Sequence, residues 1–201
     1  MTVTSTTTLA DAVLSFGLPA EFIRQRVAEI HQHVLAHSRY ILDANFTAIH
    51  TWDLEFLFKA YDDGFFAGLG QRALEGTRIQ FRLAPRLTRA GGKTTRFTKP
   101  TGEVSYEIAI ASSMLFDGFG KMDRRGLECQ NHLEGLQRIF EHELVHLVEQ
   151  LCWQTSNCAA ARFQGIARRL FLHQAHTHEL ITRRERAADS GIRYGQDIRT
   201  R

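Results

Sequence analysis

Apolar residues recur at intervals of three and four along several stretches of the chain, the spacing of one helix face. This pattern predicts helices over 19–37, from Thr51 or Asp53 to about 61, and over 133–151 and 159–171. Apolar and polar residues alternate in other stretches, which predicts strands over 78–83 and 104–111 and a further strand around 94–98. The order of helices, strands and helices favours an α+β fold.

The chain of 201 residues is long enough to bury one hydrophobic core without help from disulfides. Residues 1–18 begin with a threonine-rich stretch that has no periodicity, so we expect a flexible N-terminal tail. We expect one domain over 19–182. Residues 183–201 are polar, basic and weakly patterned, which predicts a C-terminal tail.

Composition narrows the class of protein. A chain with 43% hydrophobic and 23% charged residues is typical of a folded globular protein and not of a disordered one. No apolar run is long enough to predict a membrane-spanning helix, and the first residues lack the pattern of a secretory signal. The three cysteines show no disulfide-scaffold spacing, so we expect a reducing, cytoplasmic setting.

The long helix predicted over 133–151 contains the motif HExxH. His142 and His146 are one helical turn apart, so both imidazoles can reach the same metal ion. Glu143 follows His142 directly, where a carboxylate can accept a proton from water. The apolar neighbours indicate a buried helix, and buried histidines need partners or a metal. The motif therefore predicts a zinc site. Glu149, a turn after His146, is either a carboxylate that orients His146 or a solvated residue.

A catalytic zinc ion takes three protein ligands and a water, and the helix supplies only two. Cys158 precedes the last predicted helix, and His173 begins a histidine cluster that follows it. A helix between these two residues would span roughly 20 Å, so both should not reach one ion. Each candidate also has an explanation without a metal: Cys158 fits a small buried residue, and the histidine cluster fits a solvated helix end. The sequence therefore leaves the third ligand open between Cys158 and His173.

These segments resemble the SprT-like zinc metallopeptidases over about residues 51–172. The residues that carry the resemblance are Leu57, Phe58, Tyr61, Asp62, Phe65, Phe66 and Leu69 of one helix, the turn 87–92 with its Ala-Gly pair, the strand 107–111, and His142, Glu143 and His146. The family has a third histidine ligand some 13 to 15 residues after the second histidine of the motif. This chain has no histidine there, and Cys158 is the nearest residue that could bind a metal. The segment 171–180 is similar to a stretch of some bacterial SprT-like proteins, which points instead to His173 or His178.

The resemblance implies a zincin-like fold, in which a small antiparallel or mixed sheet packs against the HExxH helix. It also implies a zinc-dependent peptidase that acts on protein or peptide substrates, with His142 and His146 as metal ligands and Glu143 as general base. An extended substrate would pair with the strand 107–111 through main-chain hydrogen bonds.

The alternative function is a zinc-fold module that binds DNA or a protein without cleaving it. Only four of the 25 basic residues are lysine, and arginine suits phosphate groups. A basic run follows the predicted strands and would suit a phosphate backbone, although a solvated strand face explains it equally well. The run consists of Arg78, Arg82, Arg86, Arg89, Lys93, Arg96 and Lys99.

Overall fold

The computed structural model describes residues 7–87, 90–117 and 129–174, and it has the predicted α+β fold. The helices are α1 (Leu9–Ser15), α2 (Ala20–His37), α3 (Thr51–Tyr61) with the π-helical turn η1 (Asp62–Phe66), α4 (Leu69–Ala73), α5 (Ser112–Asp117), α6 (His132–Trp153) and α7 (Ala161–Phe171). The strands are β1 (Arg78–Leu83), β2 (Gly92–Thr98) and β3 (Val104–Ile110). The expected strand around 94–98 is therefore confirmed as β2.

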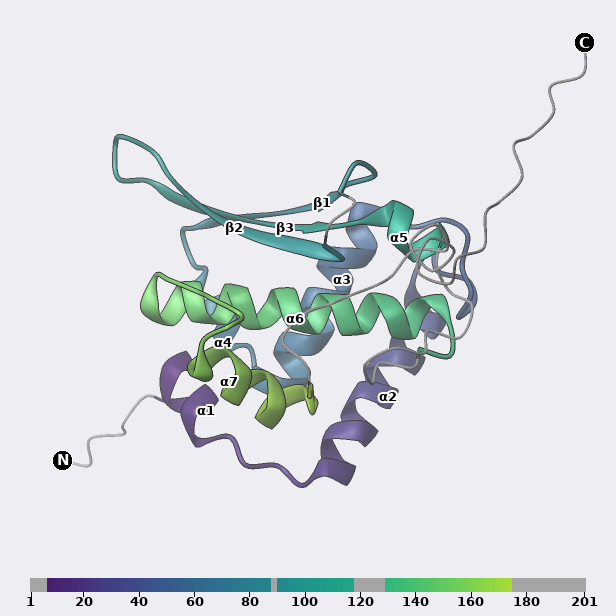
Figure 1. The fold of residues 1–201 in the computed structure, drawn as a ribbon, viewed down its shortest axis with the longest axis horizontal. Helices are drawn as coiled ribbons and strands as arrows, with labels where there is room; N and C mark the ends of the chain where they lie inside the picture. Colours follow the sequence, from purple (N-terminus) through teal and green to yellow (C-terminus); the bar gives the residue numbers. More distant parts are fainter. Residues whose placement is uncertain (1–6, 88–89, 118–128, 175–201) are drawn as a thin grey trace, which may run out of the picture.

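The strands form a mixed sheet in the order β1-β3-β2. β3 lies in the middle, parallel to β1 and antiparallel to β2, and Ile108 stands opposite both Phe81 and Thr94. The sheet forms one layer and the helices lie on one side of it, with α6 running directly beneath (Figure 1). β2 forms an outer edge of the sheet, and the central β3 has no edge left for a further strand among the described residues.

The core lies between the sheet and the helices. Ile108 and Ile110 of β3 point inward and are fully buried, because alternate residues of a strand face the same side. Phe140 of α6 lies against Phe81 of β1 and Tyr61 of α3, with ring centroids 6.5 and 6.0 Å apart. Aromatic contacts of this kind bury large areas, so they fix the position of α6 relative to the sheet.

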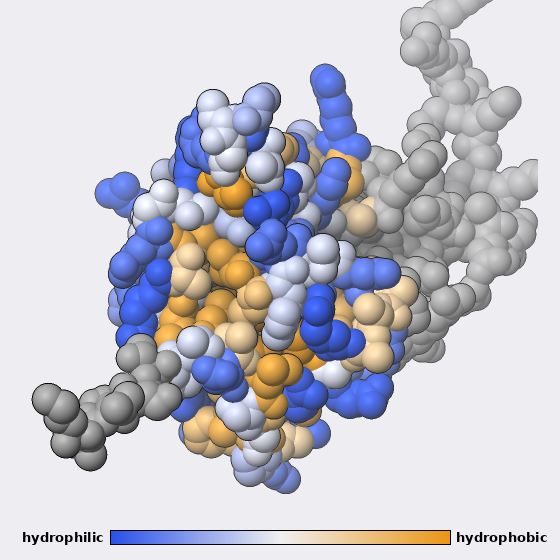
Figure 2. Space-filling model, turned by 90° about the vertical axis from the view of Figure 1, so that its left-hand side faces the viewer, coloured by the Kyte–Doolittle hydropathy of each residue, from blue (hydrophilic) through white to orange (hydrophobic). Residues whose placement is uncertain are grey.

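Apolar residues are also exposed on one side of the molecule. Figure 2 shows this side, with apolar residues in the middle of the face and polar residues around them.

Helix α6 is the longest helix described, and its ends are well defined. Asn131 caps its first turn by accepting a hydrogen bond from the amide of Glu134. Its last turn ends at Gln154, whose φ of 62° is left-handed and turns the chain back along the helix. The returning residues 155–160 therefore lie alongside the HExxH turn.

The prediction of a flexible N-terminal tail over residues 1–18 is wrong for the described residues 7–18, which include helix α1. Thr8 caps α1 in a reciprocal capping box with Asp11, and Leu9 and Val13 are buried in the core. A helix of seven residues is too short to show a clear helical period in the sequence, so the pattern missed it. Residues 175–182 of the expected domain and the expected tail 183–201 lie outside the described residues.

Candidate metal centre

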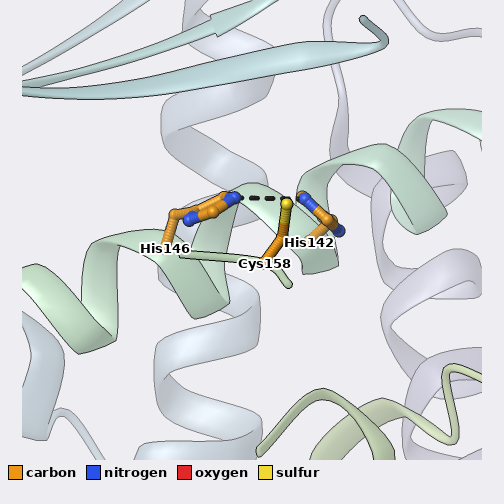
Figure 3. Close-up of side chains that lie close together, drawn as sticks. All are labelled: His142, His146 and Cys158. Atoms are coloured by element: carbon orange, nitrogen blue, oxygen red, sulfur yellow. Dashed lines mark hydrogen bonds between the residues drawn. The ribbon is translucent and has the colours of Figure 1, made fainter. Parts of the chain in front are cut away.

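The two histidines of the motif lie on the same face of α6. Their Nε2 atoms are 3.1 Å apart, and the rings approach edge to face (Figure 3). His142 is buried, and His146 lies one turn closer to the end of the helix. Helical geometry alone produces this pair, because residues four apart face the same direction.

The third candidate ligand at this face is Cys158. Gln154 turns the chain back, and the loop brings the Cys158 sulfur beside the two imidazoles (Figure 3). The ligand atoms of His142, His146 and Cys158 all lie within 4.8 Å of one another. Of the residues that the structure describes, these three form the group that could hold a metal ion.

The donor set suits zinc. Two nitrogens bound tetrahedrally to zinc are about 3.3 Å apart, given Zn–N bonds of about 2.0–2.1 Å. The observed 3.1 Å between the histidine Nε2 atoms is close to that spacing. Imidazole and thiolate are both common zinc ligands, and three protein ligands leave a fourth position for water or substrate.

Hydrogen bonds set the tautomer of His146. The hydroxyl of Ser156 donates to Oε2 of Glu149 over 2.6 Å, and its oxygen lies 2.6 Å from Nδ1 of His146. A hydroxyl has one proton, so with that proton on Glu149 it must accept from Nδ1–H of His146. The Nε2 lone pair of His146 is then directed at the metal position. Burial lowers the pKa of His146, against the opposing charge of Glu149, and so favours the neutral ring that binds metal.

Glu149 is fully buried, so of the two roles considered for it the solvated one is wrong. Its other oxygen accepts a hydrogen bond over 2.6 Å from Nε of Arg162, which belongs to α7. Arg162 also donates to the carbonyl of Thr155. This single arginine therefore ties α6, the loop with Cys158 and α7 together.

Phe163 provides an apolar wall. Its ring centroid lies 4.8 Å from that of His142 and 4.5 Å from that of His146. Phe163 is buried in the core, so it limits the rotation of both imidazoles. An apolar surrounding of this kind also strengthens the electrostatic interactions of groups at the site.

Glu143 lies against β2. It is 3% exposed, and the hydroxyl of Thr94 lies 2.8 Å from Oε2 of Glu143 and 2.9 Å from its carbonyl. A Cβ at Gly92 would lie 2.6 Å from Cγ of Glu143, so only glycine leaves room for this side chain. Burial raises the pKa of Glu143 to about 7, although the hydrogen bonds from Thr94 oppose the rise.

His173 does not join the metal group. It is buried, and its Nε2 lies 2.7 Å from Oε2 of Glu141. Neither Glu141 nor His173 belongs to the group formed by His142, His146 and Cys158. The hydroxyl of Tyr61 donates to the other oxygen of Glu141 over 2.7 Å. The sequence expectation that Cys158 and His173 do not share an ion agrees with this arrangement, and His178 lies outside the described residues.

The strand 107–111 proposed for substrate pairing cannot take that role. It forms part of β3, whose two edges are occupied by β1 and β2. The alternation of apolar and polar residues predicts a strand but does not show whether it is central or at an edge. For this reason the sequence did not exclude residues 107–111 as the strand that pairs with substrate. The edge strand next to Glu143 is β2.

Some residues of the basic run form ion pairs with carboxylates, and others are exposed to solvent. Arg82 makes a two-pronged ion pair with Glu107 of β3, and Lys99 pairs with Glu103 across the hairpin turn. Arg78 and Lys93 are exposed, and Arg89 lies outside the described residues.

Several residues of the site had no signal in the sequence. They are Thr94, Ser156, Arg162 and Phe163, which reach the motif from other elements. Gly92 was visible only as part of a glycine-rich turn. A polar loop residue such as Ser156 after the HExxH helix is a weak signal, because most polar loop residues are solvated.

The chain matches no protein-family model, no curated protein and no solved structure. Within the described residues, no helix is both long and apolar enough to cross a membrane.

Proposed function

We propose that this protein is a zinc-dependent peptidase with a zincin-like fold of the SprT-like type. The observation that carries the proposal is the convergence of three donors, His142, His146 and Cys158, at the turn of α6 that also carries the buried carboxylate of Glu143. Two imidazoles, a thiolate and a neighbouring carboxylate are the groups that zinc-dependent hydrolysis needs. The helix beneath a small mixed sheet is compatible with this fold.

Glu143 is the general base of the proposed reaction. When bound, zinc supplies a Lewis acid that polarises the scissile carbonyl and acidifies a water molecule. An Oε atom of Glu143 accepts the proton of the attacking water and then passes it to the leaving amine nitrogen. Thr94 holds this carboxylate against β2, and Ser156 keeps Nε2 of His146 unprotonated.

The proposed substrate is an extended polypeptide that pairs with the edge of β2. Thr94 of β2 contacts Glu143, so a chain bound along this edge runs past the general base. Pairing of this kind uses main-chain hydrogen bonds, which are common to all peptides. The enzyme should therefore have a loose sequence preference and favour unfolded proteins.

The test is Glu143→Gln, which keeps the shape of the side chain and removes the base. We expect this variant to bind zinc as the wild type does and to lose cleavage of unfolded casein. Glu55→Gln, on the exposed surface of α3, is the matched control and should cleave normally. Undiminished cleavage by Glu143→Gln, with zinc bound, would refute the mechanism.

A second candidate function is a non-proteolytic zinc-fold module that binds DNA. The strand register places Arg78, Arg82 and Lys93 on the face of the sheet that also carries Glu107. This face lies away from α6, which runs along the other side of the sheet (Figure 1). Phosphate contacts made by these residues would weaken steeply with salt. Affinity for a short DNA duplex that falls steeply between about 50 and 200 mM salt would support this candidate, and absence of binding at low salt would exclude it.

A further inference from the structure

Cys158 differs from the two other cysteines in its surroundings. It is half-buried, as Cys152 is, but it lies in a loop between the exposed residues Asn157 and Ala159, and its sulfur belongs to the group formed with His142 and His146. Cys129 is buried, and burial raises the pKa of its thiol to about 11. Burial likewise raises the pKa of Cys152 to about 11. Both of these therefore remain thiols at neutral pH and react slowly.

A cysteine sulfur that coordinates zinc is a deprotonated thiolate at neutral pH. The thiolate is the form of cysteine that attacks oxidants. Cys158 would be such a thiolate when zinc is bound, because it lies with His142 and His146, and the residue is only partly buried. The usual third ligand of a zinc site with the HExxH motif is a histidine or a carboxylate. Low concentrations of peroxide oxidise neither of these groups in the way that they oxidise a thiolate.

We propose that Cys158 is a peroxide-modification site and that its oxidation releases the zinc ion. The Cys158 thiolate attacks one oxygen of a hydroperoxide, a new S–O bond forms and the O–O bond breaks. Sulfur is oxidised by two electrons to the sulfenate, and the peroxide is reduced. The departing hydroxide takes the proton of the sulfenic acid that is formed first, so hydrogen peroxide yields one water and the sulfenate remains.

Oxidation removes one of the three protein ligands. His142 and His146 remain as a two-ligand site, which holds zinc far less tightly than a three-ligand site. Two equivalents of a small thiol convert the sulfenate back to the thiol, with formation of a disulfide and water, and zinc then binds again. The peptidase would therefore be switched off by peroxide and restored by reductant.

The experiment follows zinc rather than peptide cleavage, because the inference rests on the zinc site of the proposed function. The full chain is loaded with zinc and its zinc content is measured first. Hydrogen peroxide is then titrated in the presence of a colorimetric zinc chelator, and modified cysteines are trapped with dimedone and located by peptide mass spectrometry. We expect about one zinc released per chain, in step with labelling of Cys158. In a parallel sample oxidised without dimedone, we expect dithiothreitol, once removed, to leave a chain that binds zinc again.

Two variants serve as controls. Cys158→His replaces the oxidisable ligand by an imidazole and should hold zinc at peroxide concentrations that empty the wild type. Cys152→Ser removes a neighbouring thiol and should release zinc as the wild type does. Should Cys158→His fail to fold, the wild-type coincidence of release and labelling still decides the matter.

Zinc retained while Cys158 is fully labelled would overturn the inference, as would equal release from Cys158→His. The two proposals fail separately. A zinc-loaded chain that releases zinc on oxidation but never cleaves casein contradicts the peptidase alone. A chain that cleaves casein and keeps its zinc under peroxide contradicts the redox site alone.

Discussion

The hydroxyl of Ser156 lies 2.6 Å from Nδ1 of His146, although the two residues belong to a loop and a helix respectively. This contact links the orientation of His146, a proposed metal ligand, to the loop that carries Cys158. A change in the loop therefore alters two of the three ligands at once. The remaining residue of the group, His142, also contacts α7 through the ring of Phe163.

Ser156→Ala should weaken zinc binding. Loss of the hydroxyl leaves Nδ1–H of His146 and the buried carboxylate of Glu149 without their shared partner, and such partners of metal ligands are typically worth about 10–100-fold in metal affinity. Competition with a chromogenic chelator measures the effect. Ser156→Thr restores a hydroxyl and should recover most of the affinity.

The matched control for this prediction is Thr155→Ala, which changes the neighbouring residue of the same loop. Thr155 contributes to the site through its main-chain carbonyl, which accepts from Arg162, and alanine keeps that carbonyl. Equal zinc affinities for Ser156→Ala and Thr155→Ala would contradict the orienting role of Ser156.

Gly92→Ala should abolish cleavage while zinc stays bound. The new Cβ would lie 2.6 Å from Cγ of Glu143, so the general base has to move away from its position. Casein cleavage and zinc content are measured on the same preparation. Gly17→Ala, where a Cβ meets only the carbonyl of Ser15 at 4.0 Å, should behave as the wild type. Normal cleavage by Gly92→Ala would show that the position of Glu143 is not critical.

Tyr61→Phe should destabilise the fold by about 1–3 kcal/mol, because the buried carboxylate of Glu141 loses a hydrogen-bond donor. Burial, reinforced by the charge of Glu141, raises the pKa of Tyr61 well above its ordinary value, so the hydroxyl stays protonated and donates. Urea unfolding measures the change in the free energy of unfolding. Tyr40→Phe, at an exposed tyrosine, should change it much less. Equal stability of the two variants would show that the hydroxyl of Tyr61 adds nothing.

The sequence predicted the parts of the site that depend on local periodicity. HExxH places two imidazoles on one helix face whatever the rest of the fold, and the alternation in β1 arises because every second residue of this strand is half-buried. The sequence could not decide between Cys158 and His173. That choice depends on how α7 packs against α6, which brings Cys158 to His142 and carries His173 to Glu141.

Other parts of the structure depend on contacts between distant segments. The hydrogen bond from Arg162 to Glu149 joins α7 to α6, and nothing in either segment alone indicates it. The order of the strands likewise follows from tertiary packing, so the edge beside Glu143 proved to be β2 rather than β3. Helix α1 escaped prediction because its two buried residues are too few to set a period.

The most direct test of the central claim is the zinc content of the purified protein after dialysis, measured for the wild type, Cys158→Ala and His173→Ala. We predict about one zinc per chain in the wild type, since the three donors form one tetrahedral site. Cys158→Ala should lose the ion, whereas His173→Ala should keep it and be less stable. Loss of zinc from His173→Ala but not from Cys158→Ala, or a wild type that takes up no zinc when it is supplied, would contradict the metal centre formed by His142, His146 and Cys158.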